Sequence, residues 1–194
     1  ATLTGRADHA GTTPMAVRSD AFLAAADMAL AINQLALEFG APAVATVGQI
    51  EVSPGAVNVV PGRTIFSVDA RHPEADRFAA LTSAIQARCA ERAAARGVEL
   101  SWQPLMGEQP QAMDEGMCRL LAESAAELGI SAMRMHSGAG HDAQVFARAC
   151  PTAMLFVPSR GGRSHSPLEF TPTDQIVPGV RILAGALHKL AFQP

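Results

Sequence analysis

Apolar residues in the first part of the chain recur with two different periods. An alternating run ends at His9, and positions 14–39 carry apolar residues three and four apart until Gly40. The first pattern predicts a strand and the second an amphipathic helix. Thr12 or Thr13 can cap the first turn of that helix, and glycine is a common helix stop.

The following residues repeat this alternation of periods. Positions 43–54 and 63–71 alternate in strand fashion around a polar loop and predict a hairpin. Positions 74–96 return to helical spacing and end at Gly97, and positions 98–104 predict a last strand. The order strand, helix, strand, strand, helix, strand favours an α+β domain, a βαββαβ two-layer sandwich with four strands backed by two helices.

A polar, proline-containing passage beginning near residue 104 then separates the domain of residues 1–105 from a second segment, residues 106–194. In the second segment, predicted helices alternate with short apolar strands, near 131–135 and over 152–159. This pattern indicates part of an α/β domain with a mostly parallel sheet. Two or three strands make a thin sheet, so we expect exposed apolar surface unless further strands cover it.

Composition narrows the function classes. The chain has 194 residues, 48% apolar and 17% charged, and a net charge of −3 with Lys189 as its one lysine. It offers no basic surface for nucleic acid or an anionic membrane. No apolar run approaches about 20 residues and no signal peptide is evident, which predicts a cytoplasmic protein. Cys89, Cys118 and Cys150 are odd in number and far apart, so we expect buried, inert thiols.

Three polar residues lie where predicted strands meet loops, namely His9, Asn58 and Arg71. Each alone is more typical of a solvated turn or a cap than of a functional site. If the first and third strands are antiparallel neighbours, His9 and Asn58 share one edge of the sandwich. Arg71 is nine residues beyond Gly62, which is about 30 Å at roughly 3.3 Å per residue, so it would lie towards the opposite edge. We therefore hypothesise that His9 and Arg71 of one chain serve the same pocket only if the protein dimerises.

The second segment contains two glycine-rich loops. His165 follows a glycine pair, where a histidine can bind a metal or move a proton, and where a polar surface turn is the alternative. Gly138, Gly140 and Ala143 match the dinucleotide pattern GxGxxA. We reject that interpretation because the next helix is short and the next strand lacks an acidic residue for a ribose. The segment 162–166 fails the GxSxG pattern, because it ends in serine.

Five segments in order, "GRADHAGTTPM", "AVNVVPG", "DARH", "SGAGHDAQ" and "FVPSRGGRSHSPLEF", resemble the di-metal amidohydrolases of the aminoacylase and carboxypeptidase type. The resemblance is strongest to the branch of N-carbamoyl-L-amino-acid hydrolases, known from hydantoin utilisation, and allantoate amidohydrolases. It implies that residues 1–105 are a lid that forms a homodimer. It also implies that residues 106–194 are the C-terminal part of a catalytic domain with two divalent metal ions, zinc or manganese.

The same resemblance implies roles for individual residues. His165 matches a metal ligand, and His9 matches a lid histidine that reaches the partner's active site and stabilises the oxyanion. Asn58 and Arg71 match residues that hold the small-molecule substrate, with Arg71 on its carboxylate. The implied reaction is attack of a metal-bound hydroxide on a linear amide or ureido carbon, with a glutamate as proton shuttle.

The glycine loop of the family has a match in this sequence, but most of the family's metal ligands do not. Gly138 and Gly140 match a loop that approaches the substrate through its backbone. The other ligands and the glutamate have no counterpart here, and a catalytic zinc needs about three protein ligands. We therefore expect a piece of such an enzyme, inactive by itself, with His165 in solvent. The alternatives are a non-catalytic dimerisation and ligand-binding module, and a related aminoacylase or carboxypeptidase.

Overall fold

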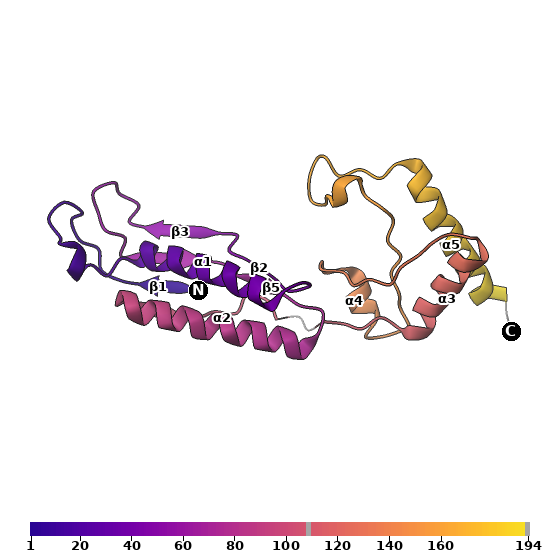
Figure 1. Cartoon of the computed structure of the whole chain (residues 1–194), viewed down its shortest axis with the longest axis horizontal. Coiled ribbons are helices and arrows are strands. Elements are labelled where there is room, and N and C mark those ends of the chain that lie inside the picture. Colours follow the sequence, from indigo (N-terminus) through magenta and orange to yellow (C-terminus); the bar gives the residue numbers. More distant parts are fainter. Residues whose placement is uncertain (108–109, 193–194) are drawn as a thin grey trace. The chain divides into compact units, whose positions relative to one another are not determined.

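A computed structural model describes residues 1–107 and 110–192 (Figure 1). The chain divides into two compact units, Ala1–Pro110 and Gln111–Pro194. This division falls close to the boundary near residue 105 that the polar passage suggests. The two units are described separately below.

The first unit contains a four-stranded sheet in the order β3-β4-β1-β6 and a two-stranded ribbon of β2 and β5. The strands are β1 (Thr2–Thr4), β2 (Val44–Thr46), β3 (Ile50–Ser53), β4 (Arg63–Phe66), β5 (Asp69–Arg71) and β6 (Glu99–Ser101). The pairs β1–β4, β1–β6, β2–β5 and β3–β4 are all antiparallel. The predicted hairpin is therefore present, but each of its two runs is interrupted midway, so one hairpin contributes to two sheets.

The first long helix, α1 (Ala21–Phe39), begins later than its apolar spacing predicts. Its N-cap is Asp20, whose carboxylate accepts hydrogen bonds from two first-turn amides, and not Thr12 or Thr13. The residues before it form the short 3-10 turn η1 (Met15–Val17) and an extended connection. An aspartate is a strong cap, because its oxygen satisfies amides that have no partner inside the helix.

The second helix, α2 (Ala75–Arg96), ends as predicted at Gly97, which adopts the left-handed φ of 61°. Both helices contribute to one apolar core with β1 and β4. Its largest fully buried side chains include Phe66, Leu3, Met28, Ile32, Leu81 and Cys89. An ion pair between Asp27 and Arg96, 2.7 Å from Nε to Oδ2, links α1 to α2.

Helix α1 corrects one expectation about the chain. Among the described residues it is the one helix that is long and apolar enough, by length and composition, to cross a membrane. The expectation that no run approaches this length is therefore wrong by that criterion. Seven of its residues are buried, and they pack into the core of the first unit. Packing in a globular core explains the same apolar composition.

The second unit contains α3 (Glu115–Glu127), α4 (Asp142–Phe146), η2 (Arg160–Gly162) and α5 (Thr173–Phe192). The described residues from 110 to 192 contain no strand, so the strands predicted near 131–135 and over 152–159 are absent there. Apolar sequence favours a strand only where neighbouring backbone is available to pair with it. The α/β layer expected for this segment therefore does not form among these residues.

The second unit buries little apolar surface. Helix α5 packs on the segment before η2, since a Cβ on Gly179 would lie 2.6 Å from Cγ1 of Val157. Many large apolar side chains stay exposed, among them Met133, Val145, Phe146, Leu168, Val180, Leu187 and Phe192. Exposed apolar surface in this segment agrees with the prediction.

The cysteines only partly follow their prediction. Cys89 is buried, Cys118 is half-buried and Cys150 is exposed. Cys150 lies beyond the end of α4, and its Sγ donates to the carbonyl oxygen of Phe146 at 3.5 Å. The expectation of a buried thiol is therefore wrong for Cys150.

Candidate functional site

His9 and Asn58 lie side by side at one edge of the first unit. The chain continues beyond β1 to His9, which forms an antiparallel bridge with Val59. The amide of Ala10 donates to the carbonyl oxygen of Asn58 at 2.8 Å. Both side chains of the pair are exposed. Their proximity follows from the antiparallel neighbours that the strand order predicts.

The backbone of Gly11 fixes the His9 imidazole. The Gly11 amide donates to Nδ1 of His9 at 3.0 Å. A nitrogen that accepts a hydrogen bond carries no proton, so the neutral ring carries its proton on Nε2. A Cβ on Gly11 would lie only 3.2 Å from Cε1 of His9, and the absence of a side chain permits this close approach. The Nε2–H group can therefore donate to a carbonyl oxygen.

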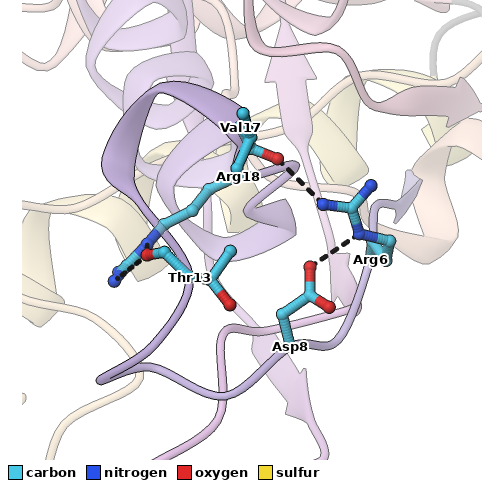
Figure 2. A network of polar contacts seen from close by, with 5 residues as sticks. All are labelled: Arg6, Asp8, Thr13, Val17 and Arg18. Atoms are coloured by element: carbon cyan, nitrogen blue, oxygen red, sulfur yellow. Dashed lines mark hydrogen bonds and ion pairs between the residues drawn. The ribbon is translucent and has the colours of Figure 1, made fainter.

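Arg18 holds the turn that follows His9 (Figure 2). Its Nη2 donates to the carbonyl oxygen of Ala10 at 2.6 Å, a contact outside the residues drawn in the figure. Its Nε and Nη2 both donate to the carbonyl oxygen of Thr13 at 3.0 Å. Arg18 is half-buried. One guanidinium thus joins the two ends of the turn that contains Gly11.

A second arginine, Arg6, fixes the other side of the same loop (Figure 2). Its Nε donates to Oδ2 of Asp8 at 2.6 Å and its Nη2 to the carbonyl oxygen of Val17 at 2.9 Å. Its own amide donates to the carbonyl oxygen of Ser19 at 2.9 Å. A Cβ on the preceding Gly5 would lie 2.0 Å from that Ser19 oxygen. The two chain segments therefore pack backbone to backbone here.

Arg71 lies at the opposite end of the first unit from His9. Arg63 pairs with Thr4, and the amide of Phe66 donates to the carbonyl oxygen of Ala1 at 3.0 Å. The strand that leads to Arg71 therefore passes the start of β1, whereas His9 lies beyond its end. Figure 1 shows β5 at one end of this unit and the indigo loop of the first residues at the other.

The guanidinium of Arg71 is paired within its own strand. Its Nε donates to Oδ1 of Asp69 at 2.9 Å and its Nη2 to Oδ2 at 2.5 Å. Residues two apart on a strand share a face, which places the two groups together. The hydrogen bond from Arg71 lowers the pKa of Asp69, and the same bond raises the pKa of Arg71. About half of each side chain is exposed to solvent.

The glycine loop of the second unit is wholly exposed around Gly138 and Gly140. Within this loop, the hydroxyl of Ser137 donates to the carbonyl oxygen of Ala139 at 2.8 Å. His141 occupies the N-cap of α4 but makes no side-chain cap bond there. Its ring instead meets the ring of Phe156 edge-on, with centroids 6.2 Å apart.

His165 is exposed and adopts a left-handed φ of 54°. Its amide donates to Oε2 of Glu169 at 2.9 Å. The loop is closed where the amide of Arg160 donates to the carbonyl oxygen of Phe170 at 2.8 Å, and the Arg160 guanidinium lies 4.6 Å from the Phe170 ring centre. A non-glycine residue in this region costs about 1 kcal/mol or more, and such residues cluster at functional sites.

The donor groups of the described residues do not fit a two-metal centre. Over residues 1–107 and 110–192, no three side chains of His, Cys, Asp or Glu come together to hold a metal ion. A catalytic zinc takes about three protein ligands and an open position. His165 offers one imidazole, so the described residues do not supply such a ligand set by themselves.

Comparison with known proteins shows the family to which the chain belongs. The sequence profile of peptidase family M20/M25/M40 matches residues 7–189. This chain belongs to that family. Enzymes of the M20 family generally depend on two metal ions.

Relatives of this M20 family member carry amidohydrolase names. The allantoate amidohydrolase of Escherichia coli is 40% identical over 196 residues, which cover 99% of this chain and 47% of that protein. An N-carbamoyl-L-amino-acid amidohydrolase of Paenarthrobacter aurescens is 37% identical over 186 residues, 96% of this chain and 45% of that protein. A crystal structure of a hydantoinase/carbamoylase family amidase from Burkholderia multivorans gives a TM-score of 0.91 at 36% identity, covering 100% of this chain and 47% of that one. The chain spans about half the length of these relatives.

Several residues of the site in this M20 chain escape the sequence reasoning. Arg18 lies inside the helix predicted over 14–39, where it reads as a surface residue. Asp69 is detectable, because Asp-x-Arg on a predicted strand places both charges on one face. No local signal identifies Arg6 or Gly11, since their partners are set by the course of the backbone.

Proposed function

We propose that this chain is part of a metal-dependent amidohydrolase that cleaves a linear ureido or amide C–N bond in a small carboxylate substrate. N-carbamoyl-L-amino acids and allantoate are the expected substrate types. The observation that carries the proposal is the exposed His9, whose Nδ1 is bound by the Gly11 amide and whose Nε2 therefore carries the donor proton. The amidohydrolase names of the relatives agree with it.

His9 is proposed to act on the carbonyl oxygen of the substrate. That oxygen gains negative charge when the carbonyl carbon is attacked, and a donor already held in place stabilises the charge without reorganising. The amide of the neighbouring Asn58 can donate to the substrate and accept from it. In the second unit, Gly138 and Gly140 would approach the substrate through their backbone. His165 would contribute one ligand to two divalent ions, zinc or manganese, whose other ligands are not found among the described residues.

The proposed lid is the first unit, an α+β sandwich, and we propose that it forms a homodimer. His9 and Arg71 lie beyond opposite ends of β1 in one chain. A small substrate that needs the oxyanion donor at one end and the guanidinium for its carboxylate at the other would receive them from two different chains. Dimerisation would thus complete the site. The second unit would then be the C-terminal part of the catalytic domain.

The experiment tests His9 in the full-length protein that carries this sequence. His9→Ala should lower kcat by about 10²-fold, as loss of one oxyanion donor does elsewhere, and leave the metal content unchanged. Kinetics and elemental analysis measure the two quantities. His188→Ala is the matched control, because that histidine lies on α5 and contacts the Phe192 ring at 5.0 Å. Loss of metal in His9→Ala, or an unchanged kcat, would refute the assigned role.

A substrate panel tests the reaction class. The full-length protein should hydrolyse an N-carbamoyl-L-amino acid or allantoate in preference to N-acyl amino acids and dipeptides. Preference for the latter two would indicate an aminoacylase or a carboxypeptidase. The 194-residue chain alone should hydrolyse none of them and behave as a non-catalytic, dimerising module, since its described residues lack a metal-binding cluster. Turnover by the isolated chain would contradict that expectation.

A further inference from the structure

We propose that Arg18 is a positioning residue for His9, because it clamps the turn that holds the Gly11 amide against Nδ1 and so keeps the imidazole proton on Nε2. This inference rests on the proposed function in one respect only, the use of His9 as a donor to the substrate. The placement of the proton itself can be measured without any substrate.

The turn after His9 is closed at both ends. The amides of Thr12 and Thr13 return to the carbonyl oxygen of His9, at 3.3 and 3.1 Å. The carbonyl oxygens of Ala10 and Thr13 both receive hydrogen bonds from Arg18. Gly11 lies between these two acceptors, so the direction of its N–H group is set by atoms that Arg18 holds on either side.

The clamp uses a property of arginine that lysine lacks. Three contacts reach two carbonyl oxygens from Nε and Nη2, which lie in one rigid plane. An ammonium group is a point charge on a flexible stem and cannot reproduce that fork. Arg18 is also half-buried, so its charge-assisted hydrogen bonds are less screened than those of a fully exposed side chain.

Release of the clamp has a defined effect on His9. If the turn relaxes, the Gly11 amide leaves Nδ1, and the neutral ring can then place its proton on either nitrogen. Molecules with the proton on Nδ1 have no donor at Nε2. Arg6 binds Asp8 and Val17, on the far side of the loop, and its contacts do not include the carbonyl oxygens of Ala10 or Thr13.

A purely structural role for Arg18 makes a different prediction. In that case its removal would lower the stability of the first unit and leave the ring tautomer unchanged, because the bridge to Val59 and the amides of Thr12 and Thr13 would keep the turn closed and the Gly11 amide on Nδ1. The tautomer and the protection of the Gly11 amide therefore discriminate between positioning and general stabilisation.

The test uses the 194-residue chain labelled with nitrogen-15 in its histidines and backbone amides. Long-range nitrogen–proton spectra should show the proton of neutral His9 on Nε2 in the wild type and on both nitrogens in Arg18→Gln. Hydrogen exchange of the Gly11 amide should become at least about tenfold faster. This is the size expected when a hydrogen bond from a charged group, here the Arg18 guanidinium, is lost. Arg88→Gln is the matched control, since Arg88 pairs only weakly with Glu91 at 3.6 Å on α2.

A second variant keeps the proposal testable if Arg18→Gln does not fold. Arg18→Lys retains the charge and can reach one carbonyl oxygen, so it should give exchange between that of the wild type and that expected for Arg18→Gln. The proposal would be overturned if the variant that folds had the same His9 tautomer and the same Gly11 exchange rate as the wild type. A loss of stability in that variant would not change this conclusion.

Activity of the full-length protein separates this inference from the proposed function. Arg18→Gln should lower kcat and leave KM nearly unchanged. In Arg18→Lys, kcat should lie between that of Arg18→Gln and that of the wild type. If the tautomer shifts as expected but kcat does not change, the proposed role of His9 fails and the positioning role of Arg18 stands. If kcat falls while the tautomer and exchange stay as in Arg88→Gln, the positioning role fails and the proposed function is untouched.

Discussion

Replacing Gly5 by alanine should destabilise the first unit by about 3 kcal/mol. The added Cβ would lie 2.0 Å from the carbonyl oxygen of Ser19 and 2.9 Å from its carbon, so the obstacle is backbone and not a flexible side chain. The Gly5 segment cannot move away without cost, because the Gly5 amide donates to Gly62 at 2.8 Å and the Arg6 amide to Ser19 at 2.9 Å. Overpacking costs about 1–3 kcal/mol and each lost hydrogen bond about 1 kcal/mol.

Thermal unfolding measures this cost. For a unit of about 110 residues the unfolding entropy is roughly 0.23 kcal/mol per kelvin, at about 2.1 cal/mol/K per residue, so 3 kcal/mol lowers Tm by about 13 °C. Tryptophan fluorescence isolates the first unit from the second, because Trp102 is the one tryptophan and its ring lies 6.3 Å from the ring of Phe66.

Gly48→Ala is the matched control for this substitution. A Cβ at Gly48 would meet only the Ser67 hydroxyl, at 3.8 Å, so its Tm should stay within about 4 °C of the wild type, a change of about 1 kcal/mol. If Gly5→Ala melted within that same interval, the close backbone packing of Gly5 on Ser19 would be refuted. Because Ser19 directly follows Arg18, Gly5→Ala should also speed exchange of the Gly11 amide.

Two further predictions concern Arg71 and Cys89. In the full-length protein Arg71→Ala should raise KM for carboxylate substrates. Asp69→Asn should lower KM by up to about fivefold, because the exposed ion pair with Arg71, worth about 0.2–1 kcal/mol, no longer competes with the substrate. A rise in KM for Asp69→Asn would contradict this competition. Burial raises the pKa of Cys89 to about 11 from an ordinary 9.0, so mass spectrometry after iodoacetamide treatment at pH 8.5 should find Cys150 alkylated and Cys89 unmodified in the folded chain. Equal labelling of both cysteines would contradict the burial of Cys89. Since the pKa of this thiol is higher in the folded state, its ionisation should not affect the stability of the first unit below about pH 9. The stability should fall as the pH rises from there through about 11.

The first unit shows which features a sequence can determine. The proximity of His9 and Asn58 follows from alternation and strand order, because antiparallel neighbours bring the end of one strand to the start of the other. The start of α1 does not follow in the same way. Pro14 and the threonines before it suit a helix start locally. However, Asp20 caps the helix, and the two arginines hold the intervening loop by hydrogen bonds to carbonyl oxygens 8 and 11 residues away.

The second unit shows where sequence reasoning stops. The apolar run over 152–159 has strand composition, yet a strand requires a neighbour to pair with, and the described residues of this unit provide none. His165 illustrates the same limit for chemistry. Its loop geometry is visible, but a metal centre is a property of several ligands together, and those are not found among the described residues.

The acceptors that Arg18 and Arg6 use in the loop after His9 are largely main-chain carbonyls, at Ala10, Thr13 and Val17. Main-chain carbonyls are present whatever the side chain. Substitutions at these three positions would therefore be tolerated far better than substitutions of either arginine. The outer surface of the loop could thus diversify over evolution while the imidazole keeps its place, so one scaffold could be adapted to different substrates.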